Sequence, residues 1–358
     1  MVARKTPPRA ASRQTRLPTR SDVARLAGTS TAVVSYVVNG GPRPVSDSTR
    51  GRVLQAIKTL GYRPNAVARS LRARRSSTIG LIVPDLANPF FGELARSVEV
   101  AGFDCGNALL VGNSMGEEER EYEYVRTFLE YRIGGLIVAP VGQGRASRAQ
   151  LRTADVPVVV LDRFVPGLRV ATVVPDNVEG AAAATEHLLS HGYDNVACVA
   201  GPEGLPGAEE RVQGWSRALD AAGVPAKKRV VVRAAFGRRD GYRAARLLLE
   251  RKRRPRAIFV ASDEQAFGVL RAAARHGARV PQDLALVGFD GLDHGAYTVP
   301  GLTTMQQPIG AAGRLAVQTL LDGSQSTRKR SLTRLPVTLR RRGSCGCDDN
   351  FDEGGADE

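Results

Sequence analysis

The sequence predicts an α/β protein in which a small three-helix head, containing a helix-turn-helix, precedes a larger body of two α/β subdomains with parallel sheets. Two observations predict this architecture. Positive charge is concentrated in the first 78 residues, which hold 16 Lys and Arg against the two acids Asp22 and Asp47. After Thr78, short continuous runs of Val, Ile and Leu alternate with amphipathic segments, which is typical of buried parallel strands with crossover helices.

The charge of the head indicates its partner. The chain of 358 residues has a net charge of +15, and residues 1–78 contribute 16 − 2 = +14 of it. The remainder holds 51 − 16 = 35 basic and 36 − 2 = 34 acidic residues and is nearly neutral. A basic head on a neutral body favours a polyanion such as DNA as the partner of the head alone. The alternative is a basic surface that is merely solvated.

The N-terminus is predicted to be a flexible basic arm. It has the positive charge of a signal peptide but no apolar segment. No stretch of the chain approaches the roughly 20 apolar residues of a membrane span. We therefore expect a cytoplasmic protein that does not enter a membrane.

The head is predicted to consist of three short helices around one core. Ser21, Ser30 and Ser46 are the expected N-caps, and Gly28 is expected to end the first helix. Two short helices joined by a tight turn containing glycine form a helix-turn-helix. The expected core residues are Val23, Leu26, Ala27, Val34, Val37, Val38, Val53, Leu54, Ile57 and Leu60.

The second helix is predicted to read DNA in the major groove. Its side chains can form hydroxyl hydrogen bonds with bases and contact thymine methyl groups, while neighbouring basic residues bind phosphates. The alternative is an ordinary three-helix bundle with polar exposed residues. The expected base-reading residues are Thr31, Ala32, Ser35, Tyr36 and Asn39, and the expected phosphate contacts are Arg20, Arg25, Arg50, Arg52, Lys58 and Arg63.

The body is predicted to form two sets of parallel strands that divide near residues 160–177. Acidic residues follow several strand ends, and the carboxyl ends of parallel strands are where open α/β sheets bind ligands. Taken singly, each such Asp is more often a helix cap. These acids are Asp85, Asp162, Asp263 and Asp290. The predicted strands are "IGLIVP", "ALLVGN", "GLIVAP", "VPVVVLD", "NVACVAG", "RVVVRA", "RAIFVAS" and "LALVGFD".

The segments "DVARLAGTSTAVVSYVVNG" and "VSDSTRGRVLQAIKTLGYRPNAVARSLRARRSSTIGLIVPDLANPFF" resemble the LacI/GalR family of bacterial transcription regulators, and the resemblance extends to about residue 343. It implies that "RPNAVARSL" is a hinge helix that folds on the operator, with Leu71 inserted into the minor groove. Such a short segment is marginal as an isolated helix; the alternative is a simple linker. Many family members carry Arg at the position of Tyr36, which leaves open the base that this residue faces.

The resemblance also implies the fold and ligand of the body. Its fold is that of periplasmic sugar-binding proteins, with a small-molecule effector between the subdomains and "LTTMQQP", residues 302–308, returning the chain to the first subdomain. The residue types suit a sugar, because sugars offer hydroxyls for charged groups and apolar ring faces for aromatic stacking. The expected effector-binding residues are Asp85, Phe90, Phe91, Arg211, Phe236, Asp263 and Asp290.

The sequence predicts neither catalysis nor a cofactor or metal. No G-x-G-x-x-G follows a strand, and P-loop, G-x-S-x-G and paired-His motifs are absent. His187, His191, His276 and His294 lack an evident nucleophile partner. Cys105 and Cys198 are expected in the core. Cys345-Gly-Cys347 offers two metal ligands, but no histidine or second cysteine pair lies near it in the sequence, so we expect no metal there.

These features together predict a homodimeric repressor that binds palindromic double-stranded operator DNA and responds to a sugar or sugar derivative. Two alternatives remain: a DNA-binding regulator with a vestigial pocket, and a solute-binding protein, against which the basic head argues. The predicted organisation is a basic arm (1–18), a helix-turn-helix domain (19–64), a hinge (65–77), an effector-binding and dimerisation domain (78–343) and an acidic tail (344–358).

Overall fold

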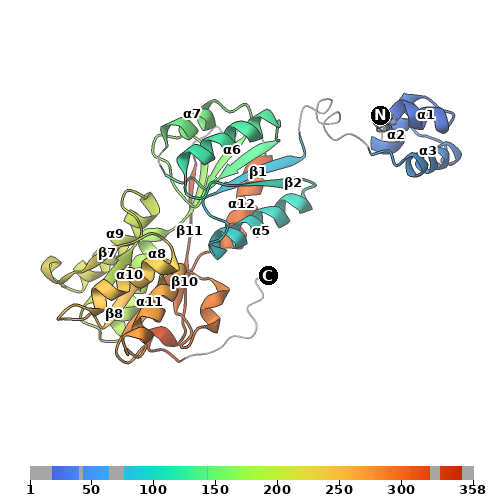
Figure 1. Ribbon diagram of the computed structural model, residues 1–358. Helices are drawn as coiled ribbons and strands as arrows, with labels where there is room; N and C mark the ends of the chain where they lie inside the picture. The colour runs from blue at the N-terminus through green and yellow to red at the C-terminus, as the bar shows by residue number, and fades with distance from the viewer. Residues whose placement is uncertain (1–17, 40–42, 64–75, 143, 323–330, 349–358) are drawn as a thin grey trace, which may run out of the picture. The chain divides into compact units, whose positions relative to one another are not determined.

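The computed structural model describes residues 18–39, 43–63, 76–142, 144–322 and 331–348. The chain divides into two compact units, Met1–Arg75 and Ser76–Glu358, called here the head and the body. Figure 1 labels their elements. A helical head and an α/β body confirm the predicted fold class. The predicted wedge residue Leu71 and the acidic residues after 348 lie outside the described residues.

The head contains the three predicted helices, α1 (Arg20–Leu26), α2 (Thr31–Asn39) and α3 (Asp47–Leu60). The N-cap of α1 is Thr19, so the prediction of Ser21 is wrong. Thr19 caps the helix instead of Ser21 because Asp22 lies three residues after Thr19 and completes a capping box with it. The Asp22 carboxylate accepts a hydrogen bond from the Thr19 backbone N at 2.9 Å, and the Asp22 backbone N donates to the Thr19 hydroxyl at 3.4 Å.

Of the other two predicted N-caps, Ser30 forms a capping hydrogen bond and Ser46 does not. The Ser30 hydroxyl accepts a hydrogen bond from the backbone N of Val33 at 3.3 Å, which confirms it as the cap of α2. Ser46 stands at the N-cap position of α3, but its hydroxyl bonds to the hydroxyl of Thr49 instead of the helix backbone. Gly28 has a φ of 61°, a conformation that suits glycine and ends α1.

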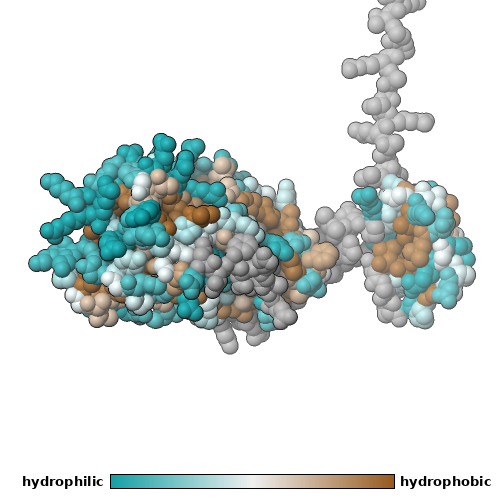
Figure 2. All heavy atoms as spheres, turned by 90° about the horizontal axis from the view of Figure 1, so that it is seen from below, coloured by the Kyte–Doolittle hydropathy of each residue, from teal (hydrophilic) through white to brown (hydrophobic). Residues whose placement is uncertain are grey.

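The core of the head is narrower than predicted. The side chains of Leu26 and Leu54 are 54% and 52% exposed, and apolar surface is visible on this unit in Figure 2. Ala24 of α1 and Ala56 of α3 lie on the buried faces of their helices. Because the buried face of each helix is centred nearer the alanine, Leu26 and Leu54 lie outside it. The buried residues are Val23, Ala24, Ala27, Val34, Val37, Val53, Ala56 and Tyr62.

The first subdomain of the body is a six-stranded parallel sheet in the order β11-β5-β4-β3-β1-β2. Its strands are β1 (Thr78–Val83), β2 (Ala108–Asn113), β3 (Gly135–Val138), β4 (Val158–Leu161), β5 (Ala171–Pro175) and β11 (Leu332–Leu335).

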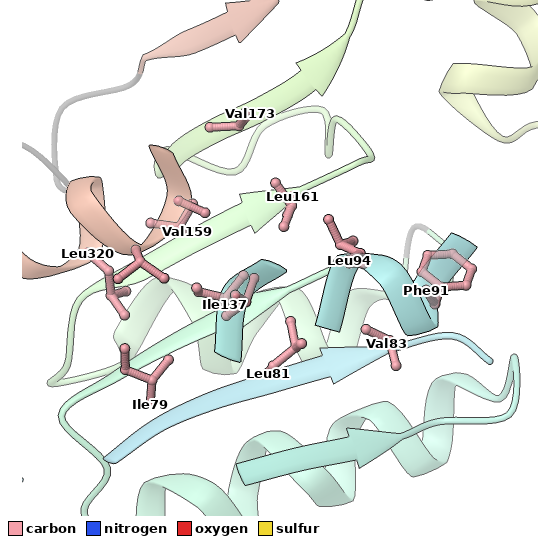
Figure 3. Close-up of a cluster of buried hydrophobic side chains, with 14 of the residues drawn as sticks. Ile79, Leu81, Val83, Phe91, Leu94, Ile137, Val159, Leu161, Val173 and Leu320 are labelled. Carbon is pink, nitrogen blue, oxygen red and sulfur yellow. The ribbon is translucent and has the colours of Figure 1, made fainter. Parts of the chain in front are cut away.

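The core of this subdomain lies between the sheet and two helices from distant parts of the chain, α5 (Pro89–Asp104) and α12 (Ile309–Leu321). Figure 3 shows side chains of β1, β3, β4 and β5 pointing to the same side, where Leu94 of α5 and Leu320 of α12 meet them. Gly135 permits this approach, because a Cβ there would lie 2.7 Å from the Cγ of Leu320. The helices α6 (Glu118–Glu130) and α7 (Arg145–Thr153) do not belong to this core. They contribute Val125 and Leu151 to a second cluster of buried hydrophobic residues.

The second subdomain is a six-stranded sheet in the order β12-β10-β9-β8-β6-β7, in which only β12 is antiparallel to its neighbour. Its strands are β6 (Val196–Ala200), β7 (Val231–Arg233), β8 (Ala257–Val260), β9 (Ala285–Asp290), β10 (Thr304–Gln306) and β12 (Thr338–Arg340). One cluster packs it against α8 (Asn177–Ser190) and α9 (Pro206–Ala221), and another against α10 (Arg238–Leu249) and α11 (Asp263–Arg275).

All eight predicted runs contain a strand, and four strands were missed. β11 and β12 have partly exposed residues with Thr and Arg among them, so they lack a continuous apolar run. β10 is only three residues long, and β5 falls inside the segment predicted to link the subdomains.

The described chain passes between the subdomains three times: after β5, after β10, and between β11 and β12. The first two passages agree with the division predicted near residues 160–177 and the return predicted at 302–308. Among the described residues, no helix is both long and apolar enough to cross a membrane.

Candidate functional site

A cleft of about 350 Å³ lies in the body and is lined by residues of both subdomains. Six of the seven predicted effector-binding residues line it: Asp85, Phe90, Phe91, Arg211, Phe236 and Asp290. Asp85 is exposed at its rim, and one of its carboxylate oxygens accepts a hydrogen bond from the backbone N of Ala87 at 2.9 Å.

Arg211 of α9 is held rigidly in the wall of the cleft. Its Nε donates to the side-chain oxygen of Asn177 at 2.8 Å, and its Nη1 donates to the carbonyl of Ala261. The guanidinium lies 3.8 Å from the ring centroid of Phe289. These described contacts use Nε and Nη1, which leaves the remaining N–H groups of Nη2 available to a ligand.

Asp290 ends β9 and faces Arg211 at 3.6 Å between Oδ1 and Nη1. Gln307 also donates a hydrogen bond to Oδ1, at 2.8 Å. Burial raises the pKa of Asp290 well above its ordinary value, and the charge of Arg211 opposes that shift. The backbone of Asp290 has a φ of 135°, which side chains rarely adopt and which marks functional sites when the fold enforces it.

Asp263 does not line the cleft, contrary to the prediction. Its carboxylate is fully buried and accepts hydrogen bonds from the backbone N of Gly291 at 3.0 Å and of Leu292 at 2.8 Å, and from the hydroxyl of Thr304 at 2.6 Å. Burial raises its pKa to about 6. Because its own backbone N donates to Asp290 at 3.3 Å, Asp263 positions that residue from behind.

The aromatic residues form two separate walls. Phe90 and Phe91 lie in the first turn of α5, whose N-cap Asn88 accepts a hydrogen bond from the Phe90 backbone N at 3.0 Å. Their two rings meet edge to face, with centroids 5.1 Å apart. On the other subdomain, Phe236 lies against Gly201, where a Cβ would come within 2.2 Å of the ring. The glycine therefore makes room for the ring.

Six polar residues that line the cleft were absent from the predicted site: Asn88, Asp162, Arg163, Asp240, Ser262 and Gln307. Asp162 follows a strand end, a signal that the sequence did offer. Arg163 pairs with it at 3.5 Å and donates from Nη1 to the carbonyls of Pro140 and Val141, both at 2.7 Å. Burial raises the pKa of Asp162 and lowers that of Arg163. No local motif identifies Arg163 or Gln307, since both depend on the folded arrangement.

The cleft thus combines aromatic walls with charged donors and acceptors fixed in orientation. Aromatic faces pack on apolar ring faces, and guanidinium and carboxylate groups form directed hydrogen bonds with hydroxyls. This arrangement can bind a small polyhydroxylated molecule.

The predicted DNA-reading surface lies on α2. Thr31 and Ala32 are exposed, and Ser35 and Tyr36 are partly exposed. Asn39 is the last residue of the helix, and the predicted phosphate contact Arg63 is exposed. Arg52, another predicted phosphate contact, donates from Nε to the carbonyl of Ala27 at 3.2 Å and so fastens α3 to the end of α1.

The cysteines differ from prediction in three respects. Cys198 is buried as expected, whereas Cys105 is exposed. Cys345, placed by the sequence at the start of an acidic tail, is fully buried within the second subdomain. The Cys345–Cys347 pair has histidine neighbours after all, because α8 brings His187 within 3.2 Å of Cys345.

Comparison with known proteins identifies the two units. Residues 19–65 match the model of bacterial regulatory proteins of the lacI family, and residues 185–345 match a periplasmic binding protein-like domain. The ribose operon repressor of Escherichia coli strain K12 is 35% identical over 329 residues, which cover 91% of this chain and 99% of that protein.

Two solved structures extend the similarity to the fold. The lac repressor dimer bound to operator and the anti-inducer ONPF is 28% identical, with a TM-score of 0.83 over 92% of this chain and 99% of that one. A LacI family transcriptional regulator from Enterococcus faecium with bound ribose is 30% identical, with a TM-score of 0.67 over 75% and 98%. The chain belongs to the LacI family of bacterial regulatory proteins.

Proposed function

We propose that this protein is a dimeric transcriptional repressor whose affinity for operator DNA is set by a sugar-like effector bound in the cleft of the body. The observation that carries the proposal is the convergence of Arg211, Asp290 and Phe236, from a helix, a strand end and a loop, on one cleft in a chain that also has a basic helix-turn-helix head.

In the head, α2 would lie in the major groove. Thr31, Ala32, Ser35, Tyr36 and Asn39 would meet base edges, and the exposed Arg25, Arg50, Lys58 and Arg63 would bind phosphates. Leu71 would act as the minor-groove wedge of the hinge, and two heads of a homodimer would read the halves of a palindrome.

In the body, Arg211 and Asp290 would hold ligand hydroxyls while Phe90, Phe91 and Phe236 pack on the ligand. Asp85 would contribute at the rim. Ribose is the first compound to test, because one relative is a ribose operon repressor and another was solved with bound ribose. Ligand contacts with both subdomains would favour one degree of cleft closure, which would alter operator affinity by about 1–3 kcal/mol.

We further propose that the protein acts in the cytoplasm and catalyses no reaction. A relative that is 35% identical over 329 residues is an operon repressor, which supports this proposal.

The proposal is tested with the full chain in two steps. Duplexes selected from a random library should yield a palindromic consensus, and ribose or another pentose or hexose should raise the Tm of the protein and change its affinity for that duplex. A consensus without any ligand response would favour the alternative of a regulator with a vestigial pocket. A ligand response without duplex binding would favour a solute-binding protein and contradict the proposal.

A further inference from the structure

A cluster of four metal-ligating side chains lies in the second subdomain, outside the effector cleft. His187 and His191 come from the carboxyl end of α8, and Cys345 and Cys347 flank Gly346 at the end of η3 (Gly343–Cys345). Their ligating atoms all lie within 4.8 Å of one another. The two pairs are more than 150 residues apart in the sequence and meet only in the fold.

Three nitrogen-to-sulfur distances within the cluster are close to those of a tetrahedral metal site. The Nε2 atom of His187 lies 3.2 Å from the sulfur of Cys345 and 3.6 Å from that of Cys347, and the Nε2 atom of His191 lies 3.4 Å from the sulfur of Cys347. With Zn–S bonds of about 2.3 Å and Zn–N bonds of about 2.0 Å, a nitrogen and a sulfur at two corners of a tetrahedron are about 3.5 Å apart.

The local backbone brings the four side chains together. His187 and His191 are four residues apart, so both project from the same face of α8, and their rings meet edge to face at 4.8 Å. Gly346 has a φ of 104°, and this left-handed conformation turns the chain so that both cysteines face the helix. A larger residue at Gly346 would be strained by this backbone conformation.

The surroundings of the cluster suit a bound thiolate. Cys345 is fully buried, and the hydroxyl of Thr303 donates to its sulfur at 3.1 Å. Hydrogen bonds from an outer sphere of residues orient the ligands of metal sites and are part of their construction. Cys347 is partly buried and His191 is exposed, which gives a metal ion a path from solvent.

We propose that His187, His191, Cys345 and Cys347 bind one zinc(II) ion. Two cysteines and two histidines are a common ligand set of structural zinc sites, which have no open coordination position. The ion would fasten η3 to α8. The first residue of the same helix, Asn177, holds Arg211 of the effector cleft, so the metal would also stabilise the element that positions Arg211.

The test uses the full chain, stripped with a chelator under reducing conditions and then supplied with zinc sulfate. After gel filtration, elemental analysis should find about one zinc per chain, and the Tm should be higher than that of the stripped protein. Cobalt(II) in place of zinc should give the visible absorption of a tetrahedral site and a thiolate-to-cobalt charge-transfer band.

Variants identify the ligands. His191→Ala and Cys347→Ser should weaken zinc binding by more than the roughly 100-fold that loss of an outer-sphere partner costs. His294→Ala and Cys105→Ser, both at exposed positions outside the cluster, should bind zinc as the wild type does.

Three results would overturn the proposal. The first is that the wild type retains no zinc, and the second is that His191→Ala and Cys347→Ser retain as much zinc as the wild type. The third is a Cys345–Cys347 disulfide that persists in the protein as purified. If the variants fail to fold, X-ray absorption of the zinc-loaded wild type decides instead. Two sulfur and two nitrogen neighbours support the site, and any other set contradicts it.

Discussion

Arg211 and Asp290 face each other across 3.6 Å in the cleft, and burial disfavours the charge of both, lowering the pKa of Arg211 and raising that of Asp290. A charge-assisted hydrogen bond is usually about 2.7–2.9 Å long, so this pair is loosely joined. Ligand hydroxyls that bridge the two groups would satisfy both, which supports the proposal that the pair binds the effector.

Replacing Arg211 should remove the effector response and spare DNA binding. Arg211→Ala removes a buried charged donor, so ligand affinity should fall by about 1.5–3 kcal/mol or more. Operator affinity without ligand should stay within a few-fold, because Arg211 belongs to the body. Isothermal titration with the identified sugar and fluorescence anisotropy with the operator measure the two effects.

Arg217→Ala is the matched control on the same helix. Arg217 is exposed and pairs with Glu179 at 2.6 Å, outside the cleft. Its loss should change neither quantity. A normal ligand response in Arg211→Ala would show that the cleft binds its ligand without this guanidinium.

Gly201→Ala should reduce ligand affinity without touching a polar contact. The added methyl group would meet the ring of Phe236 at 2.2 Å and push it from its place in the cleft wall. A misplaced aromatic wall should cost roughly 1–3 kcal/mol of binding, as overpacking does in cores. Gly92→Ala, where the new methyl group meets nothing within 4 Å, should leave ligand affinity unchanged. Equal affinities in the two variants would exclude Phe236 from the site.

The stability of the body should fall as pH rises from about 4 to about 6. Burial raises the pKa of Asp263 from 3.8 to about 6, so the folded state holds its proton more tightly than the unfolded state does. The contribution is therefore complete below about pH 4 and lost above about pH 6, and it amounts to at most about 3 kcal/mol. Urea unfolding across this range should show a flatter pH dependence in Asp263→Asn.

Asp283→Asn provides the comparison for that experiment. The hydrogen bonds from Arg279 lower the pKa of Asp283 to about 2, so its titration affects stability at more acidic pH and with the opposite sign. This variant should keep the slope of the wild type between pH 4 and 6. A wild-type slope in Asp263→Asn would contradict the assignment.

Tyr36→Ala should weaken operator binding far more than binding to random duplex, by roughly 1–3 kcal/mol, if Tyr36 reads a base. Lys58→Ala should weaken binding to both duplexes alike and lower the salt slope by about one. Anisotropy titrations at several salt concentrations separate the two patterns. Equal losses on both duplexes for Tyr36→Ala would make that residue a backbone or packing contact.

Much of the fold could be predicted because most of its strands are buried and carry continuous apolar runs, as β1, β3, β4, β6, β8 and β9 do. Three of the four missed strands, β10, β11 and β12, are short or have exposed polar residues, whereas β5 is a buried run of five residues that lies inside the segment predicted to link the subdomains. Helix caps depend on competition between neighbours: Ser21 is a good cap in isolation, but the Thr19–Asp22 pair satisfies more backbone groups.

The candidate site shows the same division between local and long-range information. Asp263 and Asp290 both stand at strand ends in the sequence. Asp290 faces the cleft, whereas Asp263 accepts hydrogen bonds from Gly291 and Thr304 and stabilises the turn there. Arg163 was missed because the carbonyls of Pro140 and Val141 that hold it come from another part of the chain. The histidines beside the cysteine pair were missed because more than 150 residues separate them from it. The resemblance to a family predicted that Arg211 and Phe236 line the effector cleft, and no local sequence pattern would have indicated either residue.

The central claim is that ligand in the cleft and operator on the head affect each other's binding, and a thermodynamic cycle tests it most directly. The Kd for operator is measured with and without saturating sugar, and the Kd for sugar with and without saturating operator. The two ratios must be equal, and the account predicts a change of about 5-fold to 150-fold in each, absent in Arg211→Ala. A sugar that binds the wild type tightly while both ratios equal one would contradict the account.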